Sequence, residues 1–294
     1  MKNDVIKGYL FAIVSAVIYG CMPLMAKHIY ADGVNPQSLV FWRNFLSIIP
    51  LGLLAYREKK TLKVPVKLLP SISLIAILGL CITPILLFSS YNYMASGTAT
   101  VLHFVYPALV VIAEMLFFKG KKQWGNIVSV LLCALGIACF YSPGDPLDPT
   151  GSTFALLSGL SFASYVILLS HFDKSQVSGF LFCFYVAVIS CIGALIFCLV
   201  TNSFTYPASI TGWGLCLLFS LLVTTGAVAL FQQSAFLIGS ERTSILSTLE
   251  PITGVILGAI FFHEPLGGRV IIGSLLVITA STLIAVFDLL KKKK

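Results

Sequence analysis

The chain has 294 residues, of which 58% are hydrophobic and only 10% are charged, and its mean hydropathy is +0.98. A water-soluble domain of this length needs far more polar residues to cover its surface, so the composition excludes a soluble globular protein. The net charge of +8 does not indicate nucleic-acid binding, because the basic residues lie between apolar runs and at the C-terminus.

Ten apolar windows of about 18–22 residues follow one another along the chain, separated by polar or Gly- and Pro-containing breaks. They are apolar on all faces and do not alternate with period two, so they indicate helices and not barrel strands. The predicted fold is therefore an all-α membrane protein with ten transmembrane helices. The predicted spans are, in order, 8–27, 37–56, 69–89, 97–117, 123–141, 151–170, 179–200, 211–234, 242–262 and 268–288.

The positions of the basic residues predict the orientation of these spans. If the N-terminus is cytoplasmic, 16 of the 19 Lys and Arg residues fall on the cytoplasmic side, including the Lys291–Lys294 tail. Only Lys27 and Arg269 fall on the opposite side, and Arg43 lies inside the second span. Because positive loops stay in the cytoplasm, we predict that both termini are cytoplasmic.

Two pairs of segments reveal an internal repeat. Gly8–Ser15 resembles Gly151–Ser158 at an offset of 143 positions, and Pro107–Phe118 resembles Pro251–Phe262 at an offset of 144. Each half then holds five spans, and an odd number means that the second copy enters the membrane from the opposite side. We therefore predict two inverted repeats, residues 1–144 and 145–294, as in secondary transporters that alternate between two mirror-related states.

Short motifs accompany the duplication: Leu249-Glu250-Pro251, Phe261-Phe262-His263-Glu264 and the glycines Gly267, Gly268 and Gly273. With these features, nearly the whole chain resembles the drug/metabolite transporter superfamily, specifically its ten-span EamA-type members. The resemblance implies a carrier, often an exporter, of amino acids, sugars or other small metabolites, with a central cavity between the halves. The chain departs from the family pattern at Lys119-Gly120-Lys121, where an acidic residue matching Glu264 is common.

Polar or titratable residues inside spans are costly and therefore mark candidate sites. At 100° per residue, Thr100, His103, Pro107 and Glu114 fall on one face of the fourth span. His103 can line a water-filled cavity and exchange protons near neutral pH; the alternative is a packing contact with a neighbouring helix. The full set of predicted cavity residues is His103, Thr100, Tyr19, Tyr91, Tyr106, Tyr165, Gln232, Gln233, Ser247 and Glu250.

Four further residues are assigned structural or gating roles. Pro107 and Pro251 lack an N–H and clash with the carbonyl four residues earlier, so each should bend its helix near the midplane. Glu114 lies near the cytoplasmic end of the fourth span, where Lys119 or Lys121 could pair with it. Arg43 could attract a substrate carboxylate or hold the bundle together, and its place in the family pattern favours the structural role.

These features predict a secondary active transporter that moves a small polar or amphipathic metabolite, such as an amino acid, by alternating access and in the outward direction. A passive channel for small solutes and an intramembrane enzyme are the alternatives. An enzyme is disfavoured because the four histidines are scattered over different helices and both membrane surfaces, and we predict no cofactor and no metal. The expected partners are the substrate and the bilayer of a bacterial plasma membrane, with the choice between monomer and homodimer open.

Overall fold

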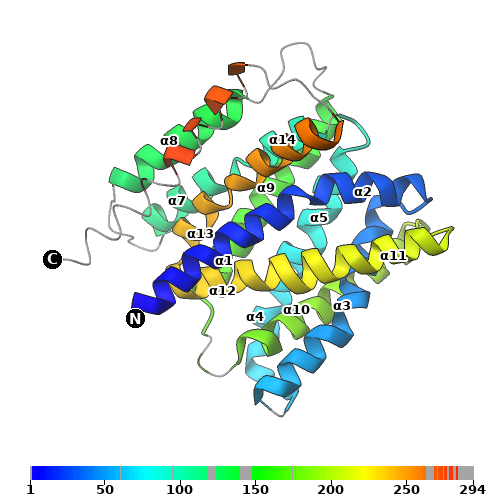
Figure 1. The fold of residues 1–294 in the computed structure, drawn as a ribbon. Helices are drawn as coiled ribbons and strands as arrows, with labels where there is room; N and C mark the ends of the chain where they lie inside the picture. The colour runs from blue at the N-terminus through cyan, green and yellow to red at the C-terminus, as the bar shows by residue number, and fades with distance from the viewer. Residues whose placement is uncertain are drawn as a thin grey trace.

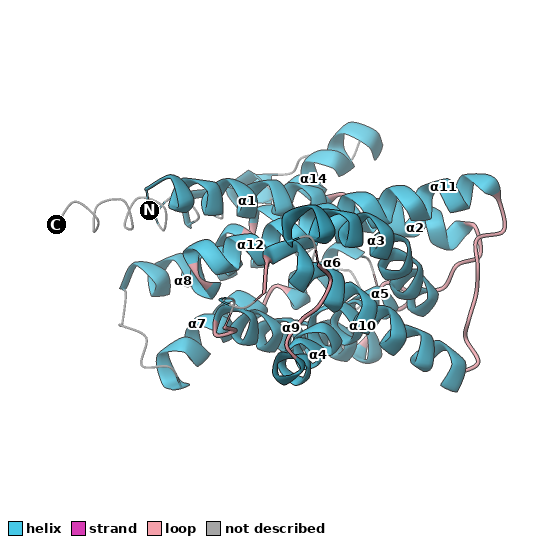
Figure 2. Ribbon diagram, turned by 90° about the horizontal axis from the view of Figure 1, so that it is seen from below, coloured by secondary structure: helices cyan, strands magenta, loops and turns pink. Residues whose placement is uncertain are grey.

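The computed structural model describes residues 2–59, 61–94, 96–117, 124–139, 148–173, 175 and 177–262, and short pieces between 268 and 283 (268–269, 271–273, 275–276, 278–280 and 283). This described part is helical and contains no strand, and short loops join the helices (Figure 2). The boundary between residues 144 and 145, Lys119, Lys121, His263, Glu264 and the Lys291–Lys294 tail lie outside it.

The helices of the first half begin almost at the N-terminus and end at Cys139 (Figure 1). The second span contains Pro50, which its helix accommodates without ending. The third span is built from a 3₁₀ turn, an α-helix, a π-helical segment and a second α-helix. The elements are α1 (Lys2–Gly20), α2 (Met22–Ala31), α3 (Pro36–Lys59), η1 (Val66–Leu68), α4 (Leu69–Ala76), η2 (Ile77–Ile82), α5 (Thr83–Ser90), α6 (Ser96–His103), α7 (Tyr106–Phe117) and α8 (Trp124–Cys139).

The helices of the second half repeat this order. The first of them begins at an N-cap, Asp148, whose side chain accepts the Gly151 N–H at 2.9 Å, followed by Pro149 at the first helical position. The elements are α9 (Pro149–Ser170), α10 (Gly179–Val200), α11 (Ile210–Phe219), η4 (Ser220–Val228), α12 (Ala229–Ile238), α13 (Ser240–Leu246) and α14 (Leu249–Phe262).

Helices overlap each of the first nine predicted spans, and the short pieces between 268 and 283 lie within the tenth. Six described helices are long and apolar enough to cross a membrane by their length and composition: Asp4–Ala31, Pro36–Glu58, Val66–Ser90, Pro149–Ser170, Gly179–Val200 and Ile210–Ile238. The predicted spans 97–117 and 242–262 each contain two shorter helices with a break between them. Most of the tenth span lies outside the described residues.

Irregular helix geometry recurs at matching positions in the two halves. The π-helical segments η2 and η4 begin at Ile77 and Ser220, which are 143 positions apart. The break between α6 and α7 lies at residues 104–105, and that between α13 and α14 lies at residues 247–248, again 143 positions apart. Each break comes shortly before the proline that the sequence predicts to bend the helix, Pro107 or Pro251.

The packing between the halves is reciprocal: the first helix of each half packs against helices of the other half. Helix α1 packs on α12 and α14, while α9 packs on α5 and α7, and α3 lies along α10 (Figure 1). The Trp42 indole N–H donates to the Thr205 carbonyl at 3.0 Å, and the Tyr185 hydroxyl donates to the Leu62 carbonyl at 2.9 Å. The two donor residues are 143 positions apart in the sequence, and so are the two acceptor residues. This is expected for two copies related by an approximate two-fold rotation.

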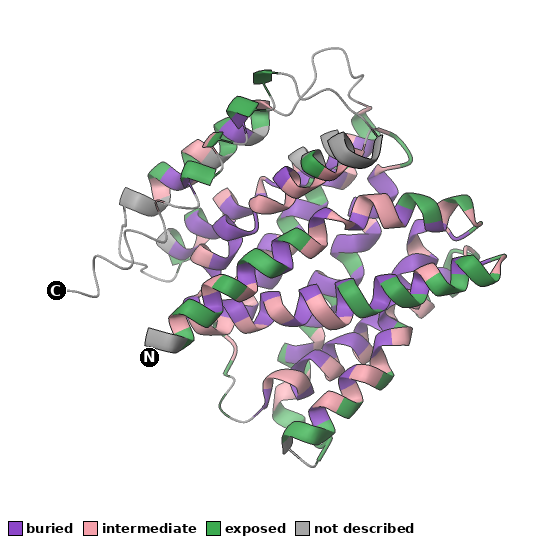
Figure 3. Ribbon diagram, viewed as in Figure 1, coloured by how far each residue is buried: buried purple, intermediate pink, exposed green. Residues whose placement is uncertain are grey.

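The interior of the bundle is rich in buried aromatic residues, among them Phe88, Tyr106, Tyr165, Phe182 and Phe231. In contrast, large hydrophobic side chains are exposed along α1, α3, α10 and α11. Figure 3 colours exposed stretches of the ribbon green, for example along α1 and α11. A soluble protein rarely exposes so much contiguous apolar surface. This distribution suits helices that face lipid.

Candidate functional site

Arg43 is a nearly buried cation in the middle of α3, and its side chain is 3% exposed. Its Nη2 donates to the Leu80 carbonyl at 3.4 Å, within the π-helical segment η2, and its guanidinium carbon lies 5.8 Å from the centre of the Phe88 ring. The Ser220 hydroxyl, at the start of η4, donates to the Arg43 carbonyl at 2.7 Å. Both irregular segments therefore contact this one residue.

The charge of Arg43 is poorly compensated. Its Nε has no hydrogen-bond partner, and among the described residues no carboxylate lies within ion-pair distance of the guanidinium. Tyr19, Tyr30, Tyr165 and Cys81 lie close enough to interact with it electrostatically. A buried guanidinium with one long hydrogen bond normally requires an anionic partner.

Glu250 brings a carboxylate to the same region. It follows the break between α13 and α14, and its N–H donates to the Ser247 carbonyl at 2.9 Å. Its side chain interacts electrostatically with Tyr19 and Tyr91, and the Tyr91 hydroxyl lies 3.4 Å from the Thr100 hydroxyl. Within the described part, the carboxylate itself accepts no hydrogen bond. Tyr19 is thus within electrostatic range of both Glu250 and Arg43.

His103 ends α6 and is 5% exposed. Its Nδ1 lies 2.8 Å from the Ser158 hydroxyl of α9, and its ring centre lies 5.3 Å from that of Tyr106 and 5.5 Å from that of Phe162. The His103 carbonyl packs against Gly159, where an added Cβ would lie only 2.7 Å from the oxygen. A cavity-facing role for His103 stays a prediction, whereas the contact with Ser158 is observed.

The predicted cavity residues are only partly brought together. His103, Tyr106, Phe162, Tyr165 and Phe231 form one connected group of rings. Three other predicted cavity residues, Gln232, Gln233 and Ser247, have contacts outside this group of rings. Gln232 is fully buried, and its side-chain oxygen accepts a hydrogen bond from the Cys183 thiol. The Gln233 side chain packs against Gly179 at the start of α10. The Ser247 hydroxyl donates to the Thr243 carbonyl one turn earlier, and the Tyr106 hydroxyl donates to the Ser244 carbonyl.

One sequence-based inference is wrong. Thr100, His103, Pro107 and Glu114 do not share a continuous helical face, because the helix breaks at residues 104–105. The step of 100° per residue applies only within an unbroken helix. Thr100 and His103 lie on α6, whereas Glu114 lies beyond the break on α7 and points to a separate site.

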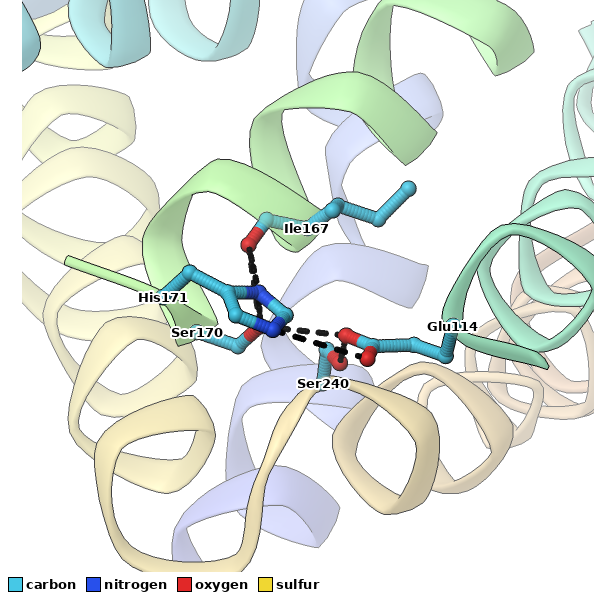
Figure 4. Close-up of polar contacts among 5 residues, drawn as sticks. All are labelled: Glu114, Ile167, Ser170, His171 and Ser240. Carbon is cyan, nitrogen blue, oxygen red and sulfur yellow. Dashed lines mark hydrogen bonds and ion pairs between the residues drawn. The ribbon is translucent and has the colours of Figure 1, made fainter. Parts of the chain in front are cut away.

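That separate site is a pocket of about 250 Å³ where α7, α9, α12 and α13 meet. Figure 4 shows Glu114 reaching from α7 toward the end of α9 and the start of α13. Gly239 joins α12 to α13 with φ of +87° and ψ of 165°, a conformation that is essentially restricted to glycine. We call it the Glu114 pocket; it is lined by Glu114, Ser170, His171, Ile238, Gly239, Ser240, Glu241 and Arg242.

Glu114 makes contacts across the two halves. Its Oε1 accepts the Ser240 hydroxyl at 2.7 Å and the Ser170 hydroxyl at 3.3 Å, and its Oε2 lies 3.7 Å from the His171 Nε2 (Figure 4). The sequence suggested Lys119 or Lys121 as partners, and both lie outside the described residues. Sequence reasoning missed Ser170, His171 and Ser240 because they are far from Glu114 along the chain; their only signal was a place at the ends of predicted spans.

The two ends of the bundle are both tied across the halves. At the end opposite the Glu114 pocket, where α2 meets α11, the Asp32 carboxylate accepts the Ser209 N–H at 3.1 Å. Hydrogen bonds from the Ser209 side chain and backbone hold the pKa of the Asp32 carboxyl below its ordinary value. Nearby, the Asn35 N–H donates to the Thr205 hydroxyl at 2.9 Å, and the Asn35 amide donates to the Ser203 carbonyl.

No group of three His, Cys, Asp or Glu side chains in the described part is arranged to hold a metal ion.

A family model described as the EamA-like transporter family matches the chain twice, over residues 6–142 and 149–286. A solved crystal structure shares the fold with a TM-score of 0.78, over 95% of this chain and 96% of that one, at 13% identity. A likeness at this identity concerns the fold alone.

Curated proteins that are similar to this chain are named as transporters. An uncharacterized transporter of Haemophilus influenzae is 25% identical over 190 residues, which cover 60% of this chain and 61% of that protein. The uncharacterized inner membrane transporter YhbE of Escherichia coli is 25% identical over 48% of this chain and 45% of its own length. The uncharacterized transporter YcbK of Bacillus subtilis is 22% identical over 90% and 88%. The chain thus spans about half to three fifths of the length of the first relatives that it matches.

Proposed function

Because this chain belongs to the EamA-like transporter family, we propose that it is a secondary carrier that moves a small polar metabolite out of the cell by alternating access. The chain is a transporter and a membrane protein with two family repeats. The proposal adds the mechanism, the direction and the class of substrate.

The proposed topology has ten spans with both termini in the cytoplasm, divided at residues 144 and 145 into two inverted repeats. Its support is the overlap of described helices with nine predicted spans, together with the concentration of Lys and Arg on one side. In this topology the Glu114 pocket faces the cytoplasm, and the contact between Asp32 and Ser209 faces the exterior.

The observation that carries the proposal is the pairing of irregular elements around Arg43, Tyr19 and Glu250. Two broken helices and two π-helical segments recur at equivalent positions of the two repeats. Carriers built from inverted repeats place discontinuous helices at a midplane site, because freed backbone groups can contact the substrate there. Rocking one repeat against the other then opens the site to each side of the membrane in turn.

The proposed substrate is a small metabolite that carries both a carboxylate and an amine, as an amino acid does. Arg43 supplies a guanidinium without a carboxylate partner in the described part, and Glu250 supplies a carboxylate without a hydrogen-bond donor there. A planar guanidinium matches a carboxylate in two parallel hydrogen bonds, and a carboxylate accepts from an ammonium group. A solute of this kind satisfies both charges together.

The test is exchange in liposomes that contain the purified protein. Vesicles are loaded with one unlabelled amino acid at a time, and uptake of the same labelled amino acid is measured against vesicles without internal solute. A carrier is expected to take up label faster when the same solute is inside, because the loaded site returns faster than the empty one. Uptake that neither saturates nor shows this stimulation would indicate a channel, and no uptake of any amino acid would overturn the substrate assignment.

Direction is tested in inside-out and right-side-out membrane vesicles of cells that produce the protein. An exporter is expected to accumulate labelled solute in the inside-out vesicles, in which its cytoplasmic side faces the medium. Accumulation only in right-side-out vesicles would contradict export while leaving the carrier mechanism in place.

A further inference from the structure

We propose that Tyr165 is a positioning residue for the solute site and that it acts through the π-helical segment η2. Its ring packs on Gly79 of η2, and η2 in turn supplies a carbonyl that holds the guanidinium of Arg43. Tyr165 belongs to the second repeat, on α9, whereas Gly79 and Arg43 belong to the first. The consequence for transport rests on the proposed role of Arg43 as the partner of the solute carboxylate; the contacts themselves do not.

The Tyr165 ring lies directly against the backbone of Gly79. A Cβ added at Gly79 would lie 2.5 Å from Cγ and 2.6 Å from Cε2 of the ring, and closer still to Cδ2. Only glycine therefore fits at this position while the ring keeps its place. Tyr165 is 1% exposed, its ring is nearly parallel to that of Phe231, and the Phe162 ring centre is 5.3 Å away. In such a close-packed interior the ring cannot move aside unless its neighbours repack.

A second contact joins α9 to the same segment. The Ser161 hydroxyl, one turn before Tyr165, donates to the Leu78 carbonyl at 3.0 Å. The Thr83 hydroxyl, at the start of α5, donates to the same carbonyl at 2.7 Å. Residues i and i+4 of a helix lie on one face, so Ser161 and Tyr165 approach η2 together. One face of α9 thus contacts two consecutive residues of η2, Leu78 and Gly79.

The next residue of η2 contacts the helix that carries Arg43. The Leu80 carbonyl accepts Nη2 of Arg43 at 3.4 Å and Nδ2 of Asn44 at 3.3 Å. The Asn44 Nδ2 also donates to the Val40 carbonyl at 2.8 Å, which fixes that side chain on α3. Leu80 directly follows Gly79, and the peptide unit that joins them is planar and stiff, so a displacement of Gly79 also moves the Leu80 backbone. Because the guanidinium donates to this carbonyl, its position depends on how η2 is held.

The second π-helical segment shows that such a segment forms without a ring packed on a glycine. The segment η4 begins 143 positions after η2. At the same offset, the counterparts of Gly79, Tyr165 and Arg43 are Leu222, Met22 and Val186. The contact between Tyr165 and Gly79 therefore accompanies the buried arginine and is not a requirement of the helix geometry. This is the pattern expected if the contact serves the guanidinium.

The contact also connects the solute site to movement of the repeats. Tyr165 moves with α9, so a shift of α9 against the first repeat either carries η2 along or separates the ring from Gly79. In both cases the Leu80 carbonyl moves, and the Arg43 guanidinium changes its position with it. A π-helical segment suits this role, because its irregular hydrogen bonding allows local rearrangement, and such segments are frequent at functional sites.

Nitrogen-15 NMR of the detergent-purified protein reports on the guanidinium without any substrate. The chain has four arginines, so protein labelled on arginine gives few Nε signals, and the signal that Arg43→Met removes belongs to Arg43. Gly79→Ala places a methyl group where the Tyr165 ring lies and is expected to shift this signal. Combining Gly79→Ala with Tyr165→Leu makes room for the methyl group and should return the signal toward its wild-type position.

Two single variants separate positioning from general packing. Gly52→Ala is the matched control, because Gly52 lies on α3 with Arg43 and faces a ring of the second repeat, that of Phe184. A Cβ there would lie 3.2 Å from the ring, so the added methyl group requires only a small adjustment. Tyr165→Phe keeps the ring on Gly79 and removes only the hydroxyl. Both variants should shift the Arg43 signal less than Gly79→Ala does.

Solute exchange in liposomes measures the consequence for binding. Gly79→Ala is expected to raise the amino acid concentration for half-maximal exchange about tenfold, as for a weakened hydrogen bond to a charged group. The double variant with Tyr165→Leu should recover part of this loss. Wild-type protein should prefer the amino acid to its carboxamide, and Gly79→Ala should reduce that preference, which a defect in packing alone would leave unchanged.

The proposal is refuted if Gly79→Ala moves the Arg43 signal no further than Gly52→Ala does. It is also refuted if Tyr165→Phe moves the signal as far as Gly79→Ala, since the hydroxyl would then act directly. If Gly79→Ala does not fold, Tyr165→Leu and Ser161→Ala loosen the contact without adding atoms, and an unshifted signal in both has the same meaning. If the liposomes exchange no amino acid, the proposed function fails, and the NMR results still decide whether Tyr165 positions Arg43.

Discussion

At the scale of single residues, Arg43 poses the sharpest energetic question in this protein. Placing a guanidinium in a low-dielectric interior costs several kcal/mol even after relaxation, and one hydrogen bond of 3.4 Å to Leu80 compensates little of it. The nearby tyrosines are neutral hydrogen-bonding groups, and the Phe88 ring adds a weak cation–π attraction. A residue retained at such a cost is better explained by ligand binding than by stability.

Arg43→Met is therefore expected to leave thermal stability unchanged or to raise it, since replacing poorly compensated buried charge by an apolar side chain removes its desolvation penalty. Solute exchange in liposomes should fall at least tenfold in the same variant, because the carboxylate loses its partner. Thermal unfolding of the detergent-purified protein measures the first effect and counterflow the second.

Arg43→Lys is the matched comparison, because it keeps the charge but loses the planar fork of donors. We expect partial exchange activity from it, with a weaker apparent affinity. The opposite result would be a large loss of stability in Arg43→Met, with solute exchange unimpaired in the molecules that remain folded. That result would show that Arg43 has the structural role that the sequence favoured.

At the scale of elements, the two broken helices deserve comparison with a helix that contains a proline and does not break. Pro50 lies inside α3, yet that helix continues from Pro36 to Lys59. Pro107 and Pro251 instead follow breaks at residues 104–105 and 247–248. A proline alone does not decide the outcome, so the packing around α6–α7 and α13–α14 must contribute. Gly159 against the His103 carbonyl is one such contact.

Pro107→Ala and Pro251→Ala each restore an N–H that can donate to the carbonyl four residues earlier, at His103 and Ser247 respectively. We expect the affected helix to become more continuous and the protein to become somewhat more stable. Transport should fall, because one open state is favoured over the other. Cysteine labelling from each side of the membrane, with and without substrate, measures that bias.

Pro50→Ala provides the control for this pair, since it removes a proline from a helix that is already continuous. Its labelling pattern should match that of the wild type. Accessibility unchanged from the wild type in Pro107→Ala and Pro251→Ala, as in Pro50→Ala, would mean that Pro107 and Pro251 are incidental to the conformational cycle. The broken helices would then be static features of the site.

At the scale of the whole molecule, the exchanged contacts between the halves support a common architecture for both repeats. The Trp42 and Tyr185 hydrogen bonds hold equivalent loops against equivalent helices, at positions related by the repeat. In the proposed alternating-access mechanism, such paired contacts would be made at one end and released at the other. The contact between Asp32 and Ser209 and that between Glu114 and Ser240 are the candidates for the two closed ends.

Reporter fusions test the orientation of this architecture. Fusions after Lys63, Lys122 and Lys294 are expected to report a cytoplasmic location, and fusions after Gly144 and Asn202 an external one, because the positive loops stay inside. A paired alkaline phosphatase and fluorescent protein reporter gives opposite signals on the two sides. A cytoplasmic signal after Gly144 would imply an even number of spans in the first half, and the inverted repeat would have to be abandoned.

The amino-acid sequence by itself determined the class of this protein and the register of its repeat, and its prolines marked two places where a helix was expected to bend. Each of these depends on local composition: long apolar windows specify membrane helices, a fixed offset reveals duplication, and prolines mark weak points in a helix. Helices overlapped nine predicted spans for this reason, while the tenth lies mostly outside the described residues.

Only the tertiary structure decided which polar groups meet. The π-helical segments, the isolation of Arg43 and the partners of Glu114 have no local signature, because they arise where helices from different repeats pack together. The same limit explains the false helical face from Thr100 to Glu114, since a periodic pattern cannot report a change of axis between α6 and α7. Glu114 receives hydrogen-bond donors from helices of the other half, whereas Arg43 receives no carboxylate partner from the described residues. The sequence around each residue does not indicate this difference, because the partners lie far away along the chain.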